Sequence, residues 1–504
     1  MSKKLLLTLL AVTILATAAP RKPKLVLAVV VDQFRYDYLT RFRSDYRSGF
    51  DTLLKMGAVF TSASLEHFPT VTALGHSAFL SGATPSESGI VGNEWYAREE
   101  HRTVTSVSDP QTTLLGSSGE GSSPHRLLVD TVGDELKIAN EGKTRIIGIS
   151  LKDRAAILPA GHMANGAYWF DSDTGNFVSS TYYFDELPSW VKDFNASRAA
   201  DKFAGATWLT RTMPADLKLL YPALAASPFG NELIEAFAER ALLGEQLGTH
   251  EVPDILTISF SSNDYVGHQV GPDAPEVREM SVRTDKLLGQ LFQAVDRQVG
   301  MANVLVVLTA DHGVAPVPEV NMARKMPGGR IPSDTFTHAV ERALNNRYGE
   351  NQWILNSAEG NIYLDQSLII EKKLDAAEVE QVASRALMTV PHVFRVYTRQ
   401  QLLSGTASDP VSRRVLNGFY PRRSPDLEVL LEPFWLFSEG GTSHGTPFGY
   451  DTHIPLIFMG AGIRAGVYQR PVALNDVAPT LAAILEIEPP AGSVGRVLPE
   501  IFNP

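Results

Sequence analysis

Three carboxylates and three imidazoles in this sequence stand where they could bind metal ions. Each carboxylate follows an apolar run, and the imidazoles lie beside them or in a glycine-rich segment; the six residues are Asp32, Asp264, His268, Asp311, His312 and His444. Imidazole nitrogen and carboxylate oxygen suit catalytic zinc, and this inventory matches two divalent ions. Two ions about 4 Å apart can hold both the attacking and the leaving oxygen of a phosphoryl transfer. Any one of these residues alone could be a helix cap or a surface residue, so the hypothesis depends on their co-occurrence.

A candidate nucleophile lies in the segment Phe68–His76, before a helix-like run. Thr72 would stand at the start of that helix, where the backbone amides favour the negative charge of a phosphate. Its hydroxyl has too high a pKa to attack unaided, and metal coordination would activate it. The alternative is that Thr70 or Thr72 only caps the helix. We interpret His76, one turn later, as a hydrogen-bonding residue rather than a metal ligand.

The elements that must position these residues follow an alternating pattern. Apolar runs at 24–31, 255–260 and 304–308 read as strands buried on both faces, and helical patterns lie between them, at 231–247 and 276–295. This alternation predicts an α/β fold with a mainly parallel central sheet sandwiched by helices. Ligands of such folds gather at the carboxyl ends of the strands, which is where the three acids occur.

Two segments interrupt this pattern and predict insertions in a catalytic domain that spans 20–504. The first, at about 165–229, is rich in aromatic residues and could form a lid. The second, at about 318–427, mixes helical and strand patterns and could form a small subdomain.

The first 19 residues read as a signal peptide. Lys3 and Lys4 precede the apolar run Leu5–Ala16, and small residues suited to cleavage follow at 16–18. A membrane anchor is the alternative, but the run is shorter than the roughly 20 residues that a spanning helix needs. We therefore expect no stable membrane anchor and a periplasmic or secreted protein.

The composition excludes several classes of function. The 504 residues carry a net charge of -11 and include no cysteine. A partner bound through a nucleic-acid backbone is disfavoured by the charge, although metal ions can reverse the charge of a local site. The lack of cysteine excludes disulfides, thiolate zinc sites and cysteine nucleophiles.

The motifs together resemble one family closely. They are Val30–Leu39, Pro69–His76, Gly89–Asn93, Leu151–His162, Asp264–His268, Thr309–Gly313 and His444–Pro455. In this order they are similar to the type I phosphodiesterase/nucleotide pyrophosphatase branch of the alkaline phosphatase superfamily, and within it to the PafA-type alkaline phosphatases. The resemblance covers nearly the whole chain after the signal peptide.

The resemblance implies a role for each matching residue. Asp264, His268 and His444 would bind one zinc ion, and Asp32, Asp311 and His312 the other, with Thr72 as a bridging ligand and nucleophile. Asn93, Lys152 and Arg154 would bind the phosphoryl oxygens, for which cationic and amide donors are suited. His453 competes with His444 for the last ligand position, and the His-Gly context favours His444.

The function that this resemblance implies is hydrolysis of small phosphate monoesters, with two zinc ions per chain and a phospho-threonine intermediate. The pair Lys152 and Arg154 favours the dianion of a monoester. A phosphodiesterase or nucleotide pyrophosphatase with the same metals is the alternative, and a metal-binding or phosphate-sensing protein without turnover is a more distant one. We expect a monomer.

Overall fold

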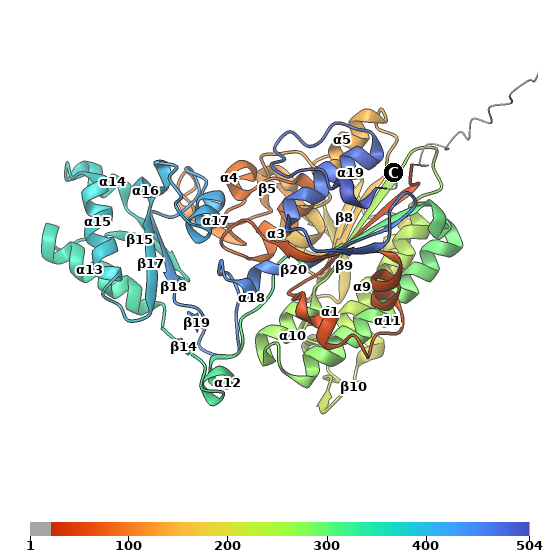
Figure 1. The fold of residues 1–504 in the computed structure, drawn as a ribbon, viewed down its shortest axis with the longest axis horizontal. Coiled ribbons are helices and arrows are strands. Elements are labelled where there is room, and N and C mark those ends of the chain that lie inside the picture. The colour runs from red at the N-terminus through yellow and green to blue at the C-terminus, as the bar shows by residue number, and fades with distance from the viewer. Residues whose placement is uncertain (1–21, 503–504) are drawn as a thin grey trace, which may run out of the picture.

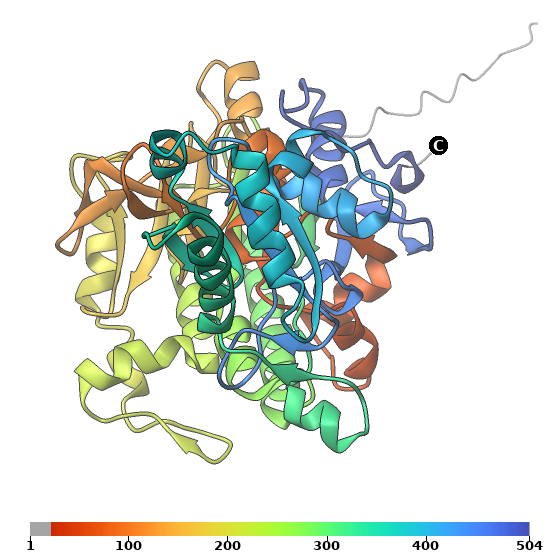
Figure 2. The same cartoon turned by 90° about the vertical axis from the view of Figure 1, so that its left-hand side faces the viewer.

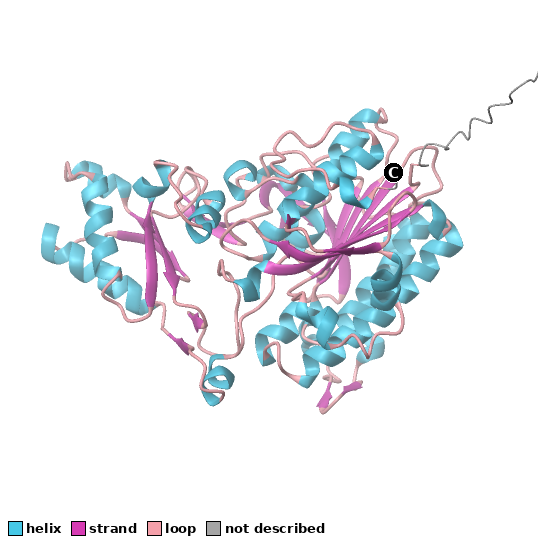
Figure 3. Cartoon of the chain, viewed as in Figure 1, coloured by secondary structure: helices cyan, strands magenta, loops and turns pink. Residues whose placement is uncertain are grey.

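The computed structural model describes residues 22–502, which form a large sheet covered by helices and a smaller separate sheet (Figures 1 and 3). The predicted signal peptide therefore lies outside the described residues. The large sheet has 12 strands, and β22 (Val472–Ala473) pairs only with β2. The order of the other strands is β21 (Gly466–Tyr468), β2 (Ala58–Ser64), β20 (His453–Gly460), β13 (Val304–Thr309), β1 (Leu25–Val31), β12 (Asp254–Phe260), β7 (Ile146–Ser150), β8 (Gly166–Asp171), β9 (Asn176–Ser180), β5 (Ser108–Leu115) and β6 (Glu120–Ser122).

The centre of this sheet is parallel and its flanks are antiparallel. Strands β13, β1, β12, β7 and β8 run in the same direction, whereas β20 and β9 pair antiparallel at the two sides. Every residue of β1, β12 and β13 is buried, which explains their continuous apolar sequences. The predicted α/β class is confirmed, with a mixed rather than wholly parallel sheet.

Helices cover both faces of the sheet (Figure 1). One face packs against α2 (Gly49–Met56), α9 (Pro228–Gly244) and α11 (Pro275–Gln298). The opposite face packs against α3 (Thr72–Ser81), α5 (Val132–Ala139), α6 (Asp153–Ile157) and α19 (Val477–Leu485). Among residues 22–502, no helix has the length and apolar character needed to cross a membrane.

The second predicted insertion contains its own sheet and core. Between β13 and β20 the chain forms a four-stranded antiparallel sheet in the order β15 (Ile354–Ala358), β16 (Asn361–Leu364), β18 (Leu427–Leu431), β17 (Val393–Thr398). Helices α13 (Asp334–Tyr348), α14 (Gln366–Glu371) and α15 (Ala376–Leu387) accompany it, and Figure 1 shows this unit at one side of the large sheet. Strand β18 extends the unit beyond the expected boundary at 427.

The first predicted insertion begins later than we expected. Strands β8 and β9 belong to the large sheet, so residues 166–180 are part of the core. The aromatic residues of this segment led us to expect an insertion, because aromatic composition does not distinguish an outer strand from a lid. Residues 181–229 form short helices and the hairpin β10 (Thr207–Trp208) and β11 (Arg211–Thr212), which projects from the body in Figure 2.

Candidate active site

The three predicted acids converge because their strands are neighbours. Asp32 follows β1, Asp311 lies two residues after β13, and Asp264 lies in α10 (Ser262–Val270), which follows β12. Strand β1 pairs in parallel with both β12 and β13, so the carboxyl ends of all three meet at one edge of the sheet. The acids of distant sequence segments are brought to one place by this register.

The inner part of the site consists of Asp32, Asp311 and His312, whose side chains are fully buried. His312 Nε2 lies 3.5 Å from Asp32 Oδ1 and 3.4 Å from Asp311 Oδ2. None of these three atoms has a hydrogen-bond partner within residues 22–502. Unpaired polar atoms are costly to bury, and three that converge are arranged as ligands for a cation. We call these three residues the inner set.

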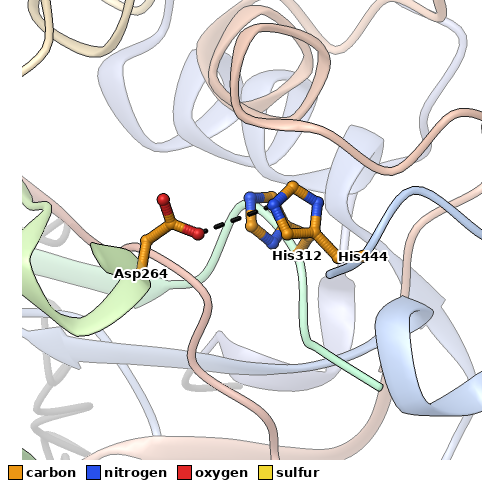
Figure 4. A group of neighbouring side chains, drawn as sticks. All are labelled: Asp264, His312 and His444. Atoms are coloured by element: carbon orange, nitrogen blue, oxygen red, sulfur yellow. Dashed lines mark ion pairs between the residues drawn. The ribbon is translucent and has the colours of Figure 1, made fainter. Parts of the chain in front are cut away.

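The outer part consists of Asp264, His268 and His444, which we call the outer set. His268 Nε2 lies 3.1 Å from Asp264 Oδ1 and 3.2 Å from His444 Nε2. His444 Nε2 lies 3.5 Å from the same oxygen of Asp264, the ion pair drawn in Figure 4. The outer set is more accessible than the inner set, since the side chain of His268 is 36% exposed.

The imidazoles are oriented by backbone carbonyls. Nδ1 of His268, His312 and His444 lies 2.8 to 2.9 Å from the carbonyl oxygen of Thr442, Gly313 and Thr70, respectively. Each Nδ1 must carry a proton to donate this bond, which leaves the lone pair of Nε2 directed into the cluster. This outer-shell arrangement is typical of metal-binding histidines.

The residues of both sets therefore fit divalent cations. In each of two groups of residues, the donor atoms all lie within 4.8 Å of one another. The first group is Asp32, Asp311 and His312, and the second is Asp264, His312 and His444. His312 satisfies this distance for both groups, because its ring stacks on His444 at 3.6 Å between centroids, as Figure 4 shows. We assign His312 to the inner set, since its free Nε2 faces Asp32 and Asp311, and His268 to the outer set by its shorter contacts.

Lys152 joins the two sets. Its ammonium Nζ lies 2.7 Å from Asp32 Oδ2, 2.7 Å from Asp264 Oδ2 and 3.3 Å from Thr72 Oγ1. The side chain is buried and lies over the ring of Tyr265 at 5.1 Å. A positive charge is thus held where a phosphoryl group on Thr72 would place its oxygens.

The charges of this cluster shift the pKa of its members. Burial would lower the pKa of Lys152, but Asp264 and Asp32 raise it above its ordinary value. Burial opposes ionisation of Asp264, yet Lys152 and His268 hold the pKa of this carboxyl well below its usual range. Burial lowers the pKa of His312 to about 3, so this imidazole is neutral and able to bind a cation near pH 7.

The structure places Thr72 as the first residue of α3. Val71 holds the N-cap position, so Thr72 does not cap the helix. Thr70 Oγ1 is engaged elsewhere, because it donates to Thr446 O at 2.9 Å and accepts from Gly445 N at 3.2 Å. Of the two hydroxyls, that of Thr72 is the one beside Lys152.

The first turn of α3 packs directly on the inner set. A Cβ atom on Gly75 would lie 2.3 Å from Asp311 O, so only glycine allows this approach. His76 bonds to Thr72 O and Ser259 Oγ, both at 2.9 Å, and is fully buried. It lies 3.3 Å from Asp311 Oδ2, and its two bonds agree with the hydrogen-bonding role that we expected.

The remaining phosphoryl-binding candidates differ in their placement. Asn93 Oδ1 accepts from Ala73 N at 2.9 Å, so its NH₂ group is left to donate beside Thr72. Arg154 lies in α6, and its guanidinium forms only a long contact with Asp153, at 3.8 Å. Its Nε is buried without a partner within residues 22–502, and no contact joins it to Thr72. The structure places Lys152 and Asn93 beside Thr72, and the expected contact of Arg154 with a phosphoryl oxygen stays a prediction.

One further residue, Gln33, supports the site without having been predicted. Gln33 Nε2 donates to Asp264 Oδ1 at 2.7 Å, and Gln33 N donates to Asp311 Oδ1 at 3.1 Å, so this residue connects the two sets. Its position directly after Asp32 was the available signal. His453, the rejected ligand, bonds to Thr61 O at 2.9 Å and stacks on Tyr36, outside both sets.

Comparison with known proteins agrees with this geometry. Residues 26–453 match the model of the family "Type I phosphodiesterase / nucleotide pyrophosphatase". The chain is 35% identical to alkaline phosphatase PafA of Elizabethkingia meningoseptica, over 97% of this chain and 96% of that protein. It is 36% identical to alkaline phosphatase PhoV of Synechococcus elongatus, over 96% and 93% of the two chains.

The crystal structure of wild-type PafA superposes on this chain with a TM-score of 0.91, covering 96% of this chain and all of the other. The residues that match the family model include Thr72 and all members of the inner and outer sets. The chain therefore belongs to the type I phosphodiesterase/nucleotide pyrophosphatase family.

Proposed function

We propose that this protein is an alkaline phosphatase that hydrolyses small phosphate monoesters, with Thr72 as the nucleophile. The observation that carries the proposal is the position of Thr72 Oγ1, at a helix N-terminus and 3.3 Å from the buried ammonium of Lys152. Two relatives of about 35% identity over nearly their whole length, PafA and PhoV, are named alkaline phosphatases, which supports the same assignment.

The chain's own groups account for most of the reaction. Thr72 Oγ1 attacks phosphorus, the bond from phosphorus to the alcohol oxygen breaks, and the phosphoryl group is held on Thr72. Water then attacks phosphorus from the same side as the departed alcohol and releases phosphate and the free hydroxyl. Lys152 and Asn93 would donate to the phosphoryl oxygens, where preorganised donors stabilise the transition state.

The two ligand sets would hold divalent cations, and we propose zinc at both. When bound, the cations supply Lewis acidity for the attacking and leaving oxygens. Nitrogen and oxygen donors without thiolate suit catalytic zinc, and the free Nε2 atoms of three histidines support this choice. Elemental analysis of purified protein should give two zinc ions per chain, and a different metal or a single ion would contradict the proposal.

A phosphodiesterase with the same residues is the second candidate. Lys152 favours the monoester, because a monoester presents one more negative charge to it than a diester does. Arg154, which the family resemblance also assigns to the phosphoryl group, would add to this preference, and its Nε is buried without a partner within residues 22–502.

The nucleophile and the substrate class can be tested together. The measurement is kcat/KM for p-nitrophenyl phosphate and for bis-p-nitrophenyl phosphate, with the wild type, Thr72→Ala, Thr72→Ser and Thr70→Ala. We expect the wild type to prefer the monoester, Thr72→Ala to fold but lose nearly all turnover, and Thr72→Ser to keep part of it. A wild type that prefers the diester would promote the phosphodiesterase, and an active Thr72→Ala would exclude this hydroxyl.

We also propose that residues 1–19 direct export and that the mature protein is a periplasmic or secreted monomer. The charged start, the apolar run and the small residues at 16–18 support export. N-terminal sequencing of the exported protein should begin near Ala19, Pro20 or Arg21. Uncleaved protein retained in the membrane would favour the anchor instead, and light scattering of the purified protein tests the monomer.

A further inference from the structure

A cavity of about 490 Å³ opens beside the outer set. His268 and Gln269 form one wall, the loop Gly440–Ser443 forms another, and Glu359 and Ser438 close the far end. A second cavity of about 440 Å³ continues past Glu359 and Ser438 towards Asp334 and Glu439. Both volumes lie within the range of small-molecule sites.

The cavity adjoins the outer set through His268, which lines it. In a phosphoryl transfer the attacking and leaving oxygens lie roughly in line, on opposite sides of phosphorus. With Thr72 acting from the side of the inner set, as the proposed function has it, the leaving oxygen would face the outer set, and the alcohol attached to it would extend towards the wall formed by His268.

The walls of this cavity are fixed by hydrogen bonds. Arg330 donates to Gly441 O at 2.7 Å and to Ser438 O at 3.0 Å, and its guanidinium is paired with Glu319 at 2.7 Å. Thr442 N donates to the carbonyl of His268 at 2.8 Å. The loop is thus anchored against the same histidine that belongs to the outer set.

The charge that lines the two cavities is negative. Glu359, Glu439 and Asp334 are their ionisable acids, and within residues 22–502 neither lining includes a lysine or an arginine. The cations nearby are already paired: Arg330 with Glu319, and Arg211 with Glu276 at 3.8 Å, although Arg211 also donates to Gln269 at 2.9 Å. An alcohol with its own negative charge would meet repulsion here.

We propose that this cavity binds the alcohol part of the substrate and that Glu359 selects monoesters of neutral or cationic polar alcohols against those of anionic alcohols. The inference rests on the proposed phosphatase activity and names the substrate class that the site prefers. Glu359 comes from the turn between β15 and β16, so the inserted sheet would contribute specificity to a reaction whose chemistry lies entirely on the large sheet.

Three monoesters of similar size test the proposal: phosphoethanolamine, glycerol 3-phosphate and 3-phosphoglycerate, whose alcohols are cationic, neutral and anionic. The measurement is kcat/KM for each with the wild type, Glu359→Gln, Glu359→Lys and the double variant Glu359→Gln/Glu439→Gln. Glu371→Gln, at the end of α14 and outside both cavities, is the matched control for charge.

We expect the wild type to prefer glycerol 3-phosphate over 3-phosphoglycerate by roughly fivefold or more, since exposed charges act through screened solvent. Glu359→Gln should reduce this ratio about two- to threefold, the double variant further, and Glu359→Lys should approach or reverse it, with the control unchanged. Salt at 0.5 M should compress all of these differences.

A ratio that is the same in the wild type and in all three cavity variants would overturn the inference, as would an equal change in Glu371→Gln. Turnover of p-nitrophenyl phosphate distinguishes a failure of this inference from a failure of the proposed function. Normal turnover with unchanged ratios would refute only the selection by Glu359, whereas no turnover of any monoester would refute the proposed function and this inference with it.

Discussion

Buried carboxyl groups occur in both the large sheet and the inserted sheet, and those of the active site differ from Glu428 of the inserted sheet in their neighbours. Asp32, Asp264 and Asp311 are buried beside Lys152, His268 and His312. Glu428, in β18 of the inserted sheet, is 4% exposed, and its Oε2 has no partner within residues 22–502. Burial alone raises the pKa of Glu428 to about 8.

The two kinds of buried carboxyl group differ in the charged side chains beside them. At the active site, cationic neighbours hold the pKa of Asp264 and Asp311 below the usual range despite burial, so these oxygens are ready to bind metal ions. Burial and the neighbouring Asp311 raise the pKa of Asp32, although Lys152 opposes this shift. In the inserted sheet no cation compensates Glu428, which stays protonated near neutral pH and reduces stability as the pH rises.

The largest effect should come from neutralising an acid of the inner set. Asp311→Asn keeps the shape of the side chain but removes the negative charge that lies beside His312 and His76. We therefore expect loss of metal and at least roughly a thousandfold loss in kcat/KM. Glu428→Gln, which neutralises the other kind of buried acid, should keep activity within about twofold. Kinetics with p-nitrophenyl phosphate and elemental analysis check both. Equal losses in the two variants would remove the distinction between the regions.

The next effect concerns the cations that compensate the acids. Lys152→Ala leaves Asp32 and Asp264 without their shared partner and removes a donor to the phosphoryl group, so we expect roughly a hundredfold loss in monoester kcat/KM. Arg154→Ala should cost less, because Lys152 also compensates the buried Asp32 and Asp264. In the double variant, monoester turnover should fall more than diester turnover. An equal fall on both substrates would argue against the monoesterase.

Metal removal should leave the site acids with only Lys152 and the histidines as partners. Treatment with a chelator should abolish activity and lower the thermal midpoint by several degrees, because ions that bind only the folded state stabilise it. Added zinc should restore both, and magnesium alone serves as the comparison. Full activity in protein shown to be free of metal would contradict the two-cation site.

The smallest effect should be the pH dependence of Glu428. Its folded pKa, about 8, lies above the value of about 4.3 for an unfolded glutamate. Below pH 4 both states are protonated and there is no penalty; as the pH rises from about 4.3 to 8, the unfolded chain ionises first and stability is lost. Glu428→Gln should therefore stabilise the protein at pH 8.5 by on the order of a few kcal/mol, and much less at pH 5.

The readout is the difference in thermal midpoint between the variant and the wild type at each pH, with Glu371→Gln as an exposed control. A constant difference at pH 5 and pH 8.5 would show that Glu428 is not neutral in the folded protein. The metal content is held fixed by excess zinc in all samples.

The sequence was informative where chemistry and local pattern coincide. The apolar runs before Asp32, Asp264 and Asp311 predicted both the central strands and the place where their ends meet. The antiparallel flanks were not predictable, because strand direction depends on connections that a local pattern does not contain. Residues 166–180 were taken for a lid since aromatic composition does not distinguish an outer strand from an insertion.

Contacts made by tertiary structure were also beyond the sequence. The Lys152–Arg154 pair predicted two cations at one place, but not that Lys152 bonds to both Asp32 and Asp264. Glu359 is about 90 residues from His268 in the chain, and only the packing of the inserted sheet places both on one cavity.

The carbonyl groups that orient the histidines also make distant segments of the site depend on one another. His268 bonds to Thr442 O, two residues before His444, and His444 bonds to Thr70 O, two residues before Thr72. The orientation of each histidine therefore depends on the segment that carries another site residue: that of His268 on the segment of His444, and that of His444 on the segment of Thr72. A relative that acquires a new loop at 438–443 must adjust the segment at 69–72 in the same step, so these two distant stretches should be exchanged together, as one unit, when sites are transplanted between members of the family.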